Sequence, residues 1–273
     1  MVLTAAVLAL SSPAALAWGR LGHEVVAIIA EHHLTPEARR AIEDLLGPGV
    51  PLPSIASWAD QVRHERPETA HWHFLDYPIH HTKPDFDPMT EEGGNVVWAV
   101  ETRIDVLRDP ASTREEKREA LLFLVHLMGD LHQPLHCADH ADHGGNADEV
   151  RWGNRRENLH HVWDDELPAM LGPGPLEIAH HLLDGFPPDE VPHIVRGHPF
   201  DWMIESHVAA RRFAYGLLPG PMGHEDPSEL PADHDDPDLS GEYAHAALPV
   251  VERRLLAAGL RLARVLNEIF GDR

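Results

Sequence analysis

The sequence has a single cysteine, Cys137, among 273 residues. One thiol cannot form an intramolecular disulfide bond, and it excludes the zinc sites that are built from several cysteines. Any metal ion that this chain binds must therefore have nitrogen and oxygen ligands.

Basic residues are also scarce, with 22 Lys and Arg against 45 Asp and Glu and a formal net charge of −23. This balance disfavours a protein that holds nucleic acid in a basic groove, because such grooves neutralise phosphates with Lys and Arg. Histidine, in contrast, is abundant, with 23 residues. Since neutral imidazole is the commonest metal ligand, a chain rich in carboxylates and imidazoles could approach phosphate through cations that it binds first.

Long hydrophobic runs are absent, and the N-terminal run at residues 2–10 is too short for a permanent membrane span. Residues 11–13 interrupt it, and residues 15–17 read Ala-Leu-Ala, the pattern of a signal-peptidase site, although no Lys or Arg precedes the run. We expect a signal peptide at residues 1–17, which makes Trp18 the first residue of the mature chain. The alternative is a buried N-terminal helix.

Helical signals dominate the remaining sequence. Thr35-Pro36 opens a helix that Gly47 closes, and the capping box Thr113–Glu116 begins a second, longer one. Apolar residues recur at helical spacing in residues 95–108, 157–167, 200–218 and 243–270. A strand is expected only near His73–Tyr77, and the acidic residues 219–240 are predicted to be a solvated loop. The prediction is one all-α domain at residues 18–273 with long loops.

The strongest local pattern of candidate metal ligands is the segment His126-Leu-Met-Gly-Asp130-Leu-His-Gln-Pro-Leu-His136. His126 and Asp130 are four residues apart and share a helix face. Pro134 then ends the helix, and His136 follows the turn. Because a His and an Asp on an apolar helix face are costly to bury alone, they indicate either a metal site or a hydrogen-bonded pair that braces the helix.

Four more clusters are weak when each is taken alone. His160 and Asp164 form a second pair at helical spacing, and Asp60-Gln-Val-Arg63 is equally compatible with a surface ion pair. The other two are the aromatic segment His71–Asp76 and the N-terminal segment Trp18–His23.

The clusters together resemble the S1/P1 family of zinc-dependent nucleases over nearly the whole chain from Trp18 onward. The motifs that carry the resemblance occur in the family's order and read WGxxGH, SWAD, HFLD, HxxGDxxQPLH, GGN and NLHxxWD. The resemblance implies a mainly helical domain of the phospholipase C/P1 nuclease type with three zinc ions.

The resemblance also implies the metal ligands. Those of the first zinc are Asp60, His73, His126 and Asp130. Those of the second are His23, a bridging oxygen of Asp130, and Trp18 through its free α-amine and carbonyl oxygen. Those of the third are His136, His160 and Asp164. His132 and His161 lie beside these ligands without a role in the motifs. A Trp18 ligand requires a cut after Ala17, because a peptide nitrogen cannot coordinate in this way.

The implied activity is endonucleolytic hydrolysis of single-stranded DNA and RNA to 5′-phosphorylated products, with 3′-nucleotidase activity. The candidate catalytic residues are Asp60, Arg63 and Asp130. Two zinc ions bridged by Asp130 would hold a shared hydroxide, and Arg63 with the third zinc would bind phosphate oxygens. Phe74 would stack on an unpaired base and Asp76 would bind its edge.

Asn146 would help to position phosphate.

The enzyme would be secreted or periplasmic. A monomer is expected, with no stable protein partner and no membrane contact. The alternatives are a zinc-dependent phospholipase C and a non-catalytic zinc-binding envelope protein. The five-residue step from Trp18 to His23 and the Asp at position 164 disfavour the phospholipase.

Overall fold

The computed structural model describes residues 18–81, 86–218 and 236–271. The expected signal peptide at residues 1–17 lies outside the described residues, as does the larger part of the acidic stretch that begins at Pro219. Within the described ranges, the regular secondary structure is helical apart from one two-stranded hairpin. This confirms the expected mainly helical fold.

The helices and strands follow one another along the chain without a repeat. The α-helices are α1 (Arg20–His32), α2 (Pro36–Leu46), α3 (Trp58–Val62), α4 (Val96–Arg108), α5 (Arg114–Asp130), α6 (Leu159–His161), α7 (Leu167–Ala169), α8 (Pro175–Asp184), α9 (Val191–Ile194), α10 (Pro199–Ala209) and α11 (Glu242–Phe270). The strands are β1 (Glu149–Trp152) and β2 (Arg155–Asn158). The 3₁₀ turns are Leu52–Ile55, Pro67–His73, Pro88–Thr90, Pro134–Cys137 and Pro188–Glu190, and the π-helical turns are Val162–Glu166 and Ala210–Ala214.

Local sequence signals set the starts of the main helices. The Thr35 side chain caps α2, and Thr113 and Glu116 form both hydrogen bonds of a capping box at the start of α5. The Asn95 side chain accepts from two backbone N–H groups of α4. These caps satisfy donors that a helix leaves unpaired at its first turn, which is why the sequence located these helices well.

Two sequence expectations about local structure were wrong. No strand forms at His73–Tyr77. His73 ends a 3₁₀ turn, and the residues after it make separate hydrogen bonds to residues 136–139, with Leu75 N–H donating to His136 O and Tyr77 O accepting from Asp139 N–H. The antiparallel hairpin of β1 and β2 was not foreseen. Its two-residue loop is Gly153-Asn154, with Gly153 at a φ of 61°, and such a pair is a recognised hairpin signal.

The acidic segment is also not fully solvated at its C-terminal end. Arg151 N–H donates to Pro237 O, and Leu239, which is buried, returns a bond to Arg151 O. The end of this segment therefore pairs with β1.

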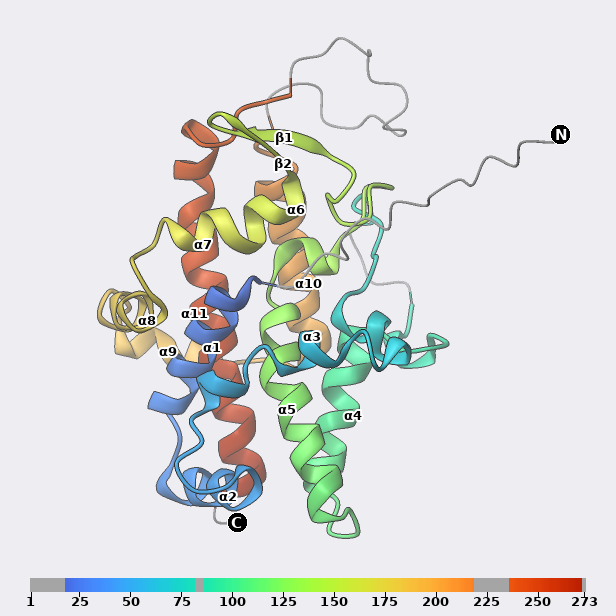
Figure 1. Ribbon diagram of the computed structural model, residues 1–273, viewed down its shortest axis with the longest axis vertical. Coiled ribbons are helices and arrows are strands. Elements are labelled where there is room, and N and C mark those ends of the chain that lie inside the picture. The colour runs from blue at the N-terminus through green and yellow to red at the C-terminus, as the bar shows by residue number, and fades with distance from the viewer. Residues whose placement is uncertain (1–17, 82–85, 219–235, 272–273) are drawn as a thin grey trace, which may run out of the picture.

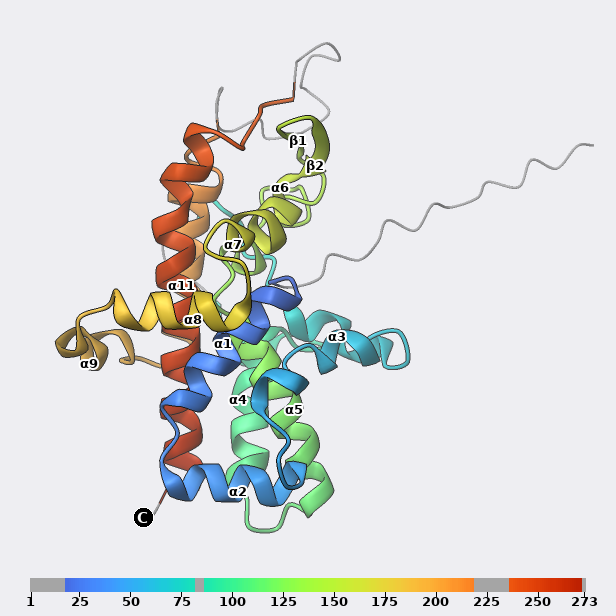
Figure 2. The same ribbon diagram turned by 60° about the vertical axis from the view of Figure 1, so that its left-hand side comes forward.

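Helix α11 runs along the length of the molecule, and the other long helices pack around it (Figure 1). Helix α1 packs against α11, α4 packs against α5, and α2 lies across the lower ends of α5 and α11. Turning the molecule shows α8 and α9 projecting on one side and α3 on the other (Figure 2). The hairpin lies at the upper end, beside α6.

The C-terminal half of α5 lies in the centre of this bundle. Every residue from Ala120 to Asp130 is buried, although an ordinary surface helix buries only one face. His126 and Asp130 are therefore enclosed together with the apolar core and need partners there. Among the described helices, none is both long and apolar enough to cross a membrane.

A substitution at Gly259 tests the close packing of α11 on α1, because a Cβ atom at this position would lie 2.5 Å from Ile29 Cβ. We expect Gly259→Ala to lower the free energy of unfolding by about 2 kcal/mol through overpacking, although alanine is the better helix former by about 1 kcal/mol. Urea denaturation measures the change. Gly241→Ala is the matched control, since nothing lies within 4 Å of its Cβ position at the start of the same helix. Equal unfolding midpoints for the two variants would contradict the close packing.

Candidate metal centre

Four side chains from three segments meet at the C-terminal end of α5, and we call them the α5 group: Asp60, His73, His126 and Asp130. His126 Nε2 lies 3.3 Å from Asp130 Oδ2 and 3.5 Å from Asp60 Oδ1. His73 Nδ1 lies 3.2 Å from His126 Nε2, 2.9 Å from Asp130 Oδ2 and 3.8 Å from Asp60 Oδ1. Helix α3 supplies Asp60, and the 3₁₀ turn that follows it supplies His73.

The separations within the α5 group suit a single small cation. Two ligand atoms bound about 2.0–2.1 Å from one tetrahedral zinc ion lie roughly 3.3 Å apart. The five separations, from 2.9 to 3.8 Å, bracket that value. Two nitrogens and two carboxylate oxygens thus face one point.

His23 lies directly beside the α5 group. Its ring stacks on that of His126, with centroids 3.9 Å apart and planes 15° apart, and its Nε2 lies 3.3 Å from Asp130 Oδ1. The two oxygens of Asp130 therefore face different partners. This is the arrangement that a bridging carboxylate between two cations requires.

Gly129 makes room for the ring of His23. A Cβ at position 129 would lie 2.6 Å from His23 Nδ1, closer than real Cβ contacts allow. A glycine inside a helix costs about 1 kcal/mol relative to alanine, so its place one residue before Asp130 has a steric reason.

A second set of side chains, the His136 group, contains His136, His160 and Asp164. His136 Nε2 lies 3.1 Å from His160 Nε2, which lies 3.2 Å from Asp164 Oδ2. His160 and Asp164 project together from α6 and the π-helical turn, as their spacing predicts. His161 points elsewhere and is half-exposed, near Asp165.

Buried Gln133 orients Asp164 and is a site residue to which the sequence analysis gave no role. Its Nε2 donates to Asp164 Oδ1 at 2.6 Å, which leaves Asp164 Oδ2 facing His160. The signal was present, since this glutamine stands in the motif HxxGDxxQPLH.

Trp18 lies two residues before α1 and is fully buried. The next residue, Gly19, donates its N–H to Asp164 O at 2.9 Å. A Cβ on Gly22 would lie 2.8 Å from Trp18 Cβ, so Trp18 also contacts the turn that precedes His23. The N-terminal segment is thereby held beside both the His136 group and His23.

Backbone carbonyls hold three imidazoles in one tautomer. The Nδ1–H groups donate to Ala56 O from His126 at 2.8 Å, to His73 O from His136 at 2.7 Å, and to Gly144 O from His160 at 2.7 Å. The Nε2 atoms are therefore left facing the neighbouring ligand atoms. Metal-binding histidines are usually oriented in this way.

The buried carboxylates of the α5 group favour the binding of a cation. Burial alone would lower the pKa of His126, but the carboxylates of Asp130 and Asp60 outweigh it and raise that pKa well above its usual value. Burial would likewise raise the pKa of Asp130, yet the histidines, His126 first, hold it well below its usual range. A proton on His126 partly balances two buried carboxylates, and a divalent cation would balance them more fully.

The two histidines of the His136 group differ. Burial would lower the pKa of His160, but the carboxylate of Asp164 outweighs burial and raises it. Burial, followed by the charge of His160, lowers the pKa of His136 to about 3, so its imidazole is neutral. Burial also raises the pKa of Asp164. A neutral imidazole with an exposed lone pair is the form that binds a metal ion.

Several buried polar atoms at the site have no hydrogen-bond partner within the described part of the chain. They are both ring nitrogens of His23, Asp60 Oδ1, His73 Nε2, Asp130 Oδ1 and the Trp18 indole nitrogen. An unpaired buried polar group is costly and rare, so the unpaired His23 Nε2, Asp60 Oδ1 and Asp130 Oδ1 fit the donor set of a metal centre. The residues present therefore fit the implied zinc ions.

The residues expected to bind phosphate and base adjoin the candidate ligands in the sequence or in their loops. Arg63 directly follows α3 and is half-buried, and Phe74 is partly exposed with its ring 5.7 Å from that of His71. Asp76 is exposed, and Asn146 donates to His143 O at 2.7 Å. Their roles stay predictions.

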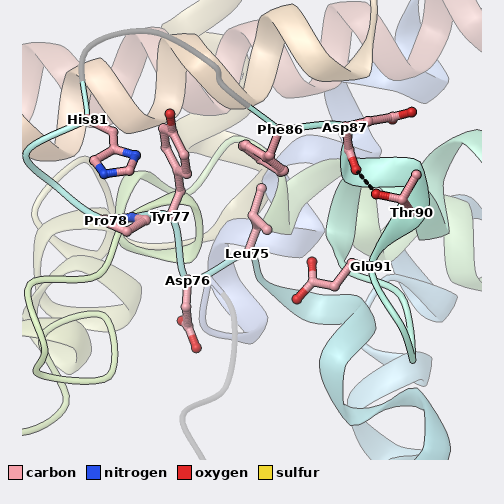
Figure 3. Close-up of a pocket in the computed structure, with 9 residues that line it drawn as sticks. All are labelled: Leu75, Asp76, Tyr77, Pro78, His81, Phe86, Asp87, Thr90 and Glu91. Carbon is pink, nitrogen blue, oxygen red and sulfur yellow. Dashed lines mark hydrogen bonds between the residues drawn. The ribbon is translucent and has the colours of Figure 1, made fainter.

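A cavity of about 320 Å³ opens beside Asp76 (Figure 3). Its wall consists of Leu75, Asp76, Tyr77, Pro78, His81, Phe86, Asp87, Thr90 and Glu91. Asp76 and Tyr77 point in opposite directions from the segment that they share, as Figure 3 shows. The aromatic wall comes from Tyr77 and Phe86, whose centroids are 5.0 Å apart, and not from Phe74.

A further cluster of possible ligands, Glu157, His161 and Glu166, lies on the surface near α6. The guanidinium of Arg155 already pairs with both glutamates. This arrangement is therefore balanced without a metal ion.

A pair of carboxyl groups, buried Asp142 and partly buried Asp148, lies in the loop that carries Gly144. The Tyr215 hydroxyl donates to Asp142 Oδ1 at 3.0 Å. Burial, followed by the charge and the hydrogen bond of Asp142, raises the pKa of Asp148 to about 7. The proton that Asp148 keeps is shared with Asp142 and gives Asp142 Oδ2 a hydrogen-bond donor. The described groups offer this oxygen no other donor.

This pair predicts a pH dependence of stability. Between about pH 4 and pH 7 the folded chain keeps a proton that Asp148, with its ordinary pKa of 3.8, releases on unfolding. The free energy of unfolding should fall as pH rises through this window, by at most about 4 kcal/mol at 1.4 kcal/mol per pKa unit. Asp148→Asn keeps a donor at every pH, so urea denaturation at pH 5 and pH 8 should show a smaller loss. Exposed Asp105→Asn should follow the wild type, and parallel curves for all three proteins would refute the shared proton.

Comparison with known proteins gives one consistent result. The S1/P1 Nuclease family model matches residues 18–271. Endonuclease 2 of Arabidopsis thaliana is 30% identical over 267 residues, which cover 93% of this chain and 91% of that protein.

Two fungal proteins are similar over the same extent. Nuclease P1 of Penicillium citrinum is 30% identical over 278 residues, with 93% of this chain and 98% of that protein covered. Nuclease S1 of Aspergillus oryzae is 28% identical over 273 residues, with 92% and 91% covered. The matched range begins at Trp18 and includes every residue of the α5 group and the His136 group.

Proposed function

This chain belongs to the S1/P1 nuclease family and is a hydrolase of phosphodiester bonds, and on that premise we propose that it is a zinc-dependent endonuclease for single-stranded nucleic acid. The proposal includes cleavage of DNA and RNA to 5′-phosphorylated products and 3′-nucleotidase activity. The observation that carries it is the convergence of the α5 group, His23 and the His136 group on one end of α5, with ligand atoms at zinc-like spacing.

Three zinc ions would be held by the residues that the motifs assign. The α5 group would hold one, and the His136 group another. The remaining ion would be held by His23, Asp130 Oδ1 and the backbone of Trp18. Two facts support this division: Asp130 presents its two oxygens to different histidines, and Gly19 ties the N-terminal segment to Asp164.

Zinc at these positions would lower the pKa of a water molecule, and its positive charge would attract phosphate oxygens. The chain's own residues then set the geometry. Asp130 would offer one oxygen to the ion of the α5 group and the other to the ion beside His23. Burial would raise the pKa of Asp60, but His126 outweighs it and lowers that pKa to about 2, so Asp60 stays ionised. Arg63 directly follows α3, the helix that carries Asp60. Its guanidinium would donate hydrogen bonds to phosphate oxygens and stabilise the negative charge that develops on them.

Base binding would use the segment that follows His73. Phe74 is partly exposed and can stack on a base, while the exposed carboxylate of Asp76 can accept hydrogen bonds from its edge. Partial desolvation, followed by the charge of Asp139, raises the pKa of Asp76. A base that stacks here must be unpaired, which gives the preference for single strands. Asn146, in the loop that also supplies Gly144 O to His160, would help to position phosphate.

We also propose that the protein is exported, acts as a monomer, and is cut after Ala17. Trp18 is buried beside His23 and Asp164, where its freed α-amine would become a ligand. An uncut chain would lack this ligand.

Metal removal and a variant of Asp130 test the proposal together. Single-stranded DNA and RNA should be hydrolysed by the mature protein, and a chelator should stop the reaction until zinc is restored. Asp130→Asn keeps the size of the side chain but should reduce kcat by more than about a hundredfold, because even residues that only orient metal ligands change activity by roughly 10–100-fold.

Asp105→Asn, an exposed change on α4, should have wild-type activity, and circular dichroism checks that Asp130→Asn folds. Phosphatidylcholine is the control substrate and should not be hydrolysed. Full activity of Asp130→Asn, or of the chelated protein, would rule out the proposed metal centre.

The role of Phe74 in base binding is tested by Phe74→Leu. Loss of one stacked base should raise KM for a single-stranded oligonucleotide about tenfold, with a smaller change in kcat, because stacking contributes about 1–3 kcal/mol per base. An oligonucleotide of abasic sites serves as the matched substrate, and its KM should not change. If both substrates respond equally, Phe74 supports the fold rather than the base.

A further inference from the structure

The turn that follows α5 joins two proposed zinc sites. Asp130 is the last residue of α5, and His136 follows only six residues later. The connecting residues Leu131, His132 and Gln133 are completely buried. Any displacement of this turn therefore changes the position of His136 relative to Asp130.

The backbone carbonyls of this turn need donors from outside the helix. The last carbonyls of a helix have no partner within it, and here water cannot reach them. Arg254 of α11 donates from Nε to His132 O at 3.2 Å, and Ser206 of α10 donates from Oγ to Leu131 O at 2.6 Å. Arg254 Nη2 in turn donates to Ser206 Oγ at 2.6 Å. Two helices thus hold two successive carbonyls through one connected set of hydrogen bonds.

The side chain of His132 is held by the same network. Its Nδ1–H donates to Met128 O at 2.7 Å, and its Nε2 accepts from Arg261 Nη1 at 3.0 Å. Glu205 joins the two arginines, since its Oε2 accepts from Arg254 Nη1 at 2.9 Å and its Oε1 from Arg261 Nη2 at 2.8 Å. His132, to which the motifs assign no role, is a structural part of this turn.

The charge of Arg254 also suits its position. Its side chain is only 7% exposed, and a buried guanidinium is costly unless nearly every N–H is bonded. A cation is stabilised at the C-terminal end of a helix, where the dipole is negative. Apolar packing could fill the same space, so a buried cation here points to a requirement for fixed geometry at the turn.

We propose that Arg254 is a positioning residue for the metal centre: with Ser206 and Glu205 it fixes the turn Leu131–Gln133 and so sets the spacing between the α5 group and the His136 group. The effect continues through Gln133, which is the last residue of this turn and orients Asp164 by its 2.6 Å hydrogen bond. This inference rests on the proposed zinc sites, and it concerns residues that touch neither substrate nor metal.

Arg264 offers a matched control on the same helix. Arg264 and Arg261 both lie over the Trp202 ring, at 5.4 and 5.2 Å from its centroid. Arg264 also donates to backbone carbonyls, those of Val195 and Gly197. These carbonyls belong to the segment before α10 and not to the turn after α5. Its removal should therefore cost stability without moving the metal ligands.

The test compares Arg254→Met, Arg254→Lys, Ser206→Ala and Arg264→Met in two measurements. Zinc content and affinity are measured by competition with a coloured chelator, and melting temperature is measured with and without chelator. Arg254→Met should bind at least one zinc ion about tenfold or more weakly, as expected for loss of a residue that orients ligands. Ser206→Ala should show a smaller loss, and Arg254→Lys should recover part of the affinity.

Arg264→Met should melt at a lower temperature but bind zinc as the wild type does. The proposal is overturned if Arg254→Met and Ser206→Ala both bind zinc normally and lower the melting temperature equally with and without chelator. If Arg254→Met fails to fold, Ser206→Ala decides between the outcomes. Absence of zinc binding in the wild type would instead refute the proposed function.

Discussion

The arrangement of the whole site depends on Asp130, a carboxylate that is completely buried at the end of a completely buried half-helix. Burial alone would drive it to take up a proton, but His126, His23 and His73 surround it and hold its pKa well below the usual range. The three histidines come from α5, α1 and the turn after α3, so the charge of one side chain ties together segments far apart in sequence. Because Asp130 and these three histidines are almost completely buried, electrostatic interactions among them are stronger than in solvent.

The surroundings of α5 explain how so many polar groups are tolerated inside a helical bundle. Backbone carbonyls orient His126, His136 and His160, and Gly129 leaves room for the ring of His23. On the opposite side, the turn after Asp130 is bonded by side chains of α10 and α11. The ligand positions are therefore determined by backbone groups and buried hydrogen bonds, which move less than exposed side chains do.

Sequence reasoning succeeded where local spacing carries the information. The capped helices and the pairs His126–Asp130 and His160–Asp164 follow from spacing along a helix, and the structure brings these pairs together. The joining of Asp60 and His73 to the first pair came from resemblance alone, since spacing cannot show which loops meet. Gln133 and Arg254 were missed for a related reason: their roles depend on a hydrogen bond to Asp164 and on a contact between α11 and the end of α5, 122 residues apart in the second case.

The acidic composition, which argues against a basic nucleic-acid groove, is compatible with this centre. Phosphate would meet cations held at the end of α5 and not a surface of Lys and Arg, so affinity for the polymer would depend on a small number of bound charges. A chain with a net charge of −23 should repel nucleic acid at long range, particularly at low salt. Capture would then require close approach of an unpaired segment, which a flexible single strand can make more readily than a stiff duplex. Charge and base stacking would in this way favour the same substrate.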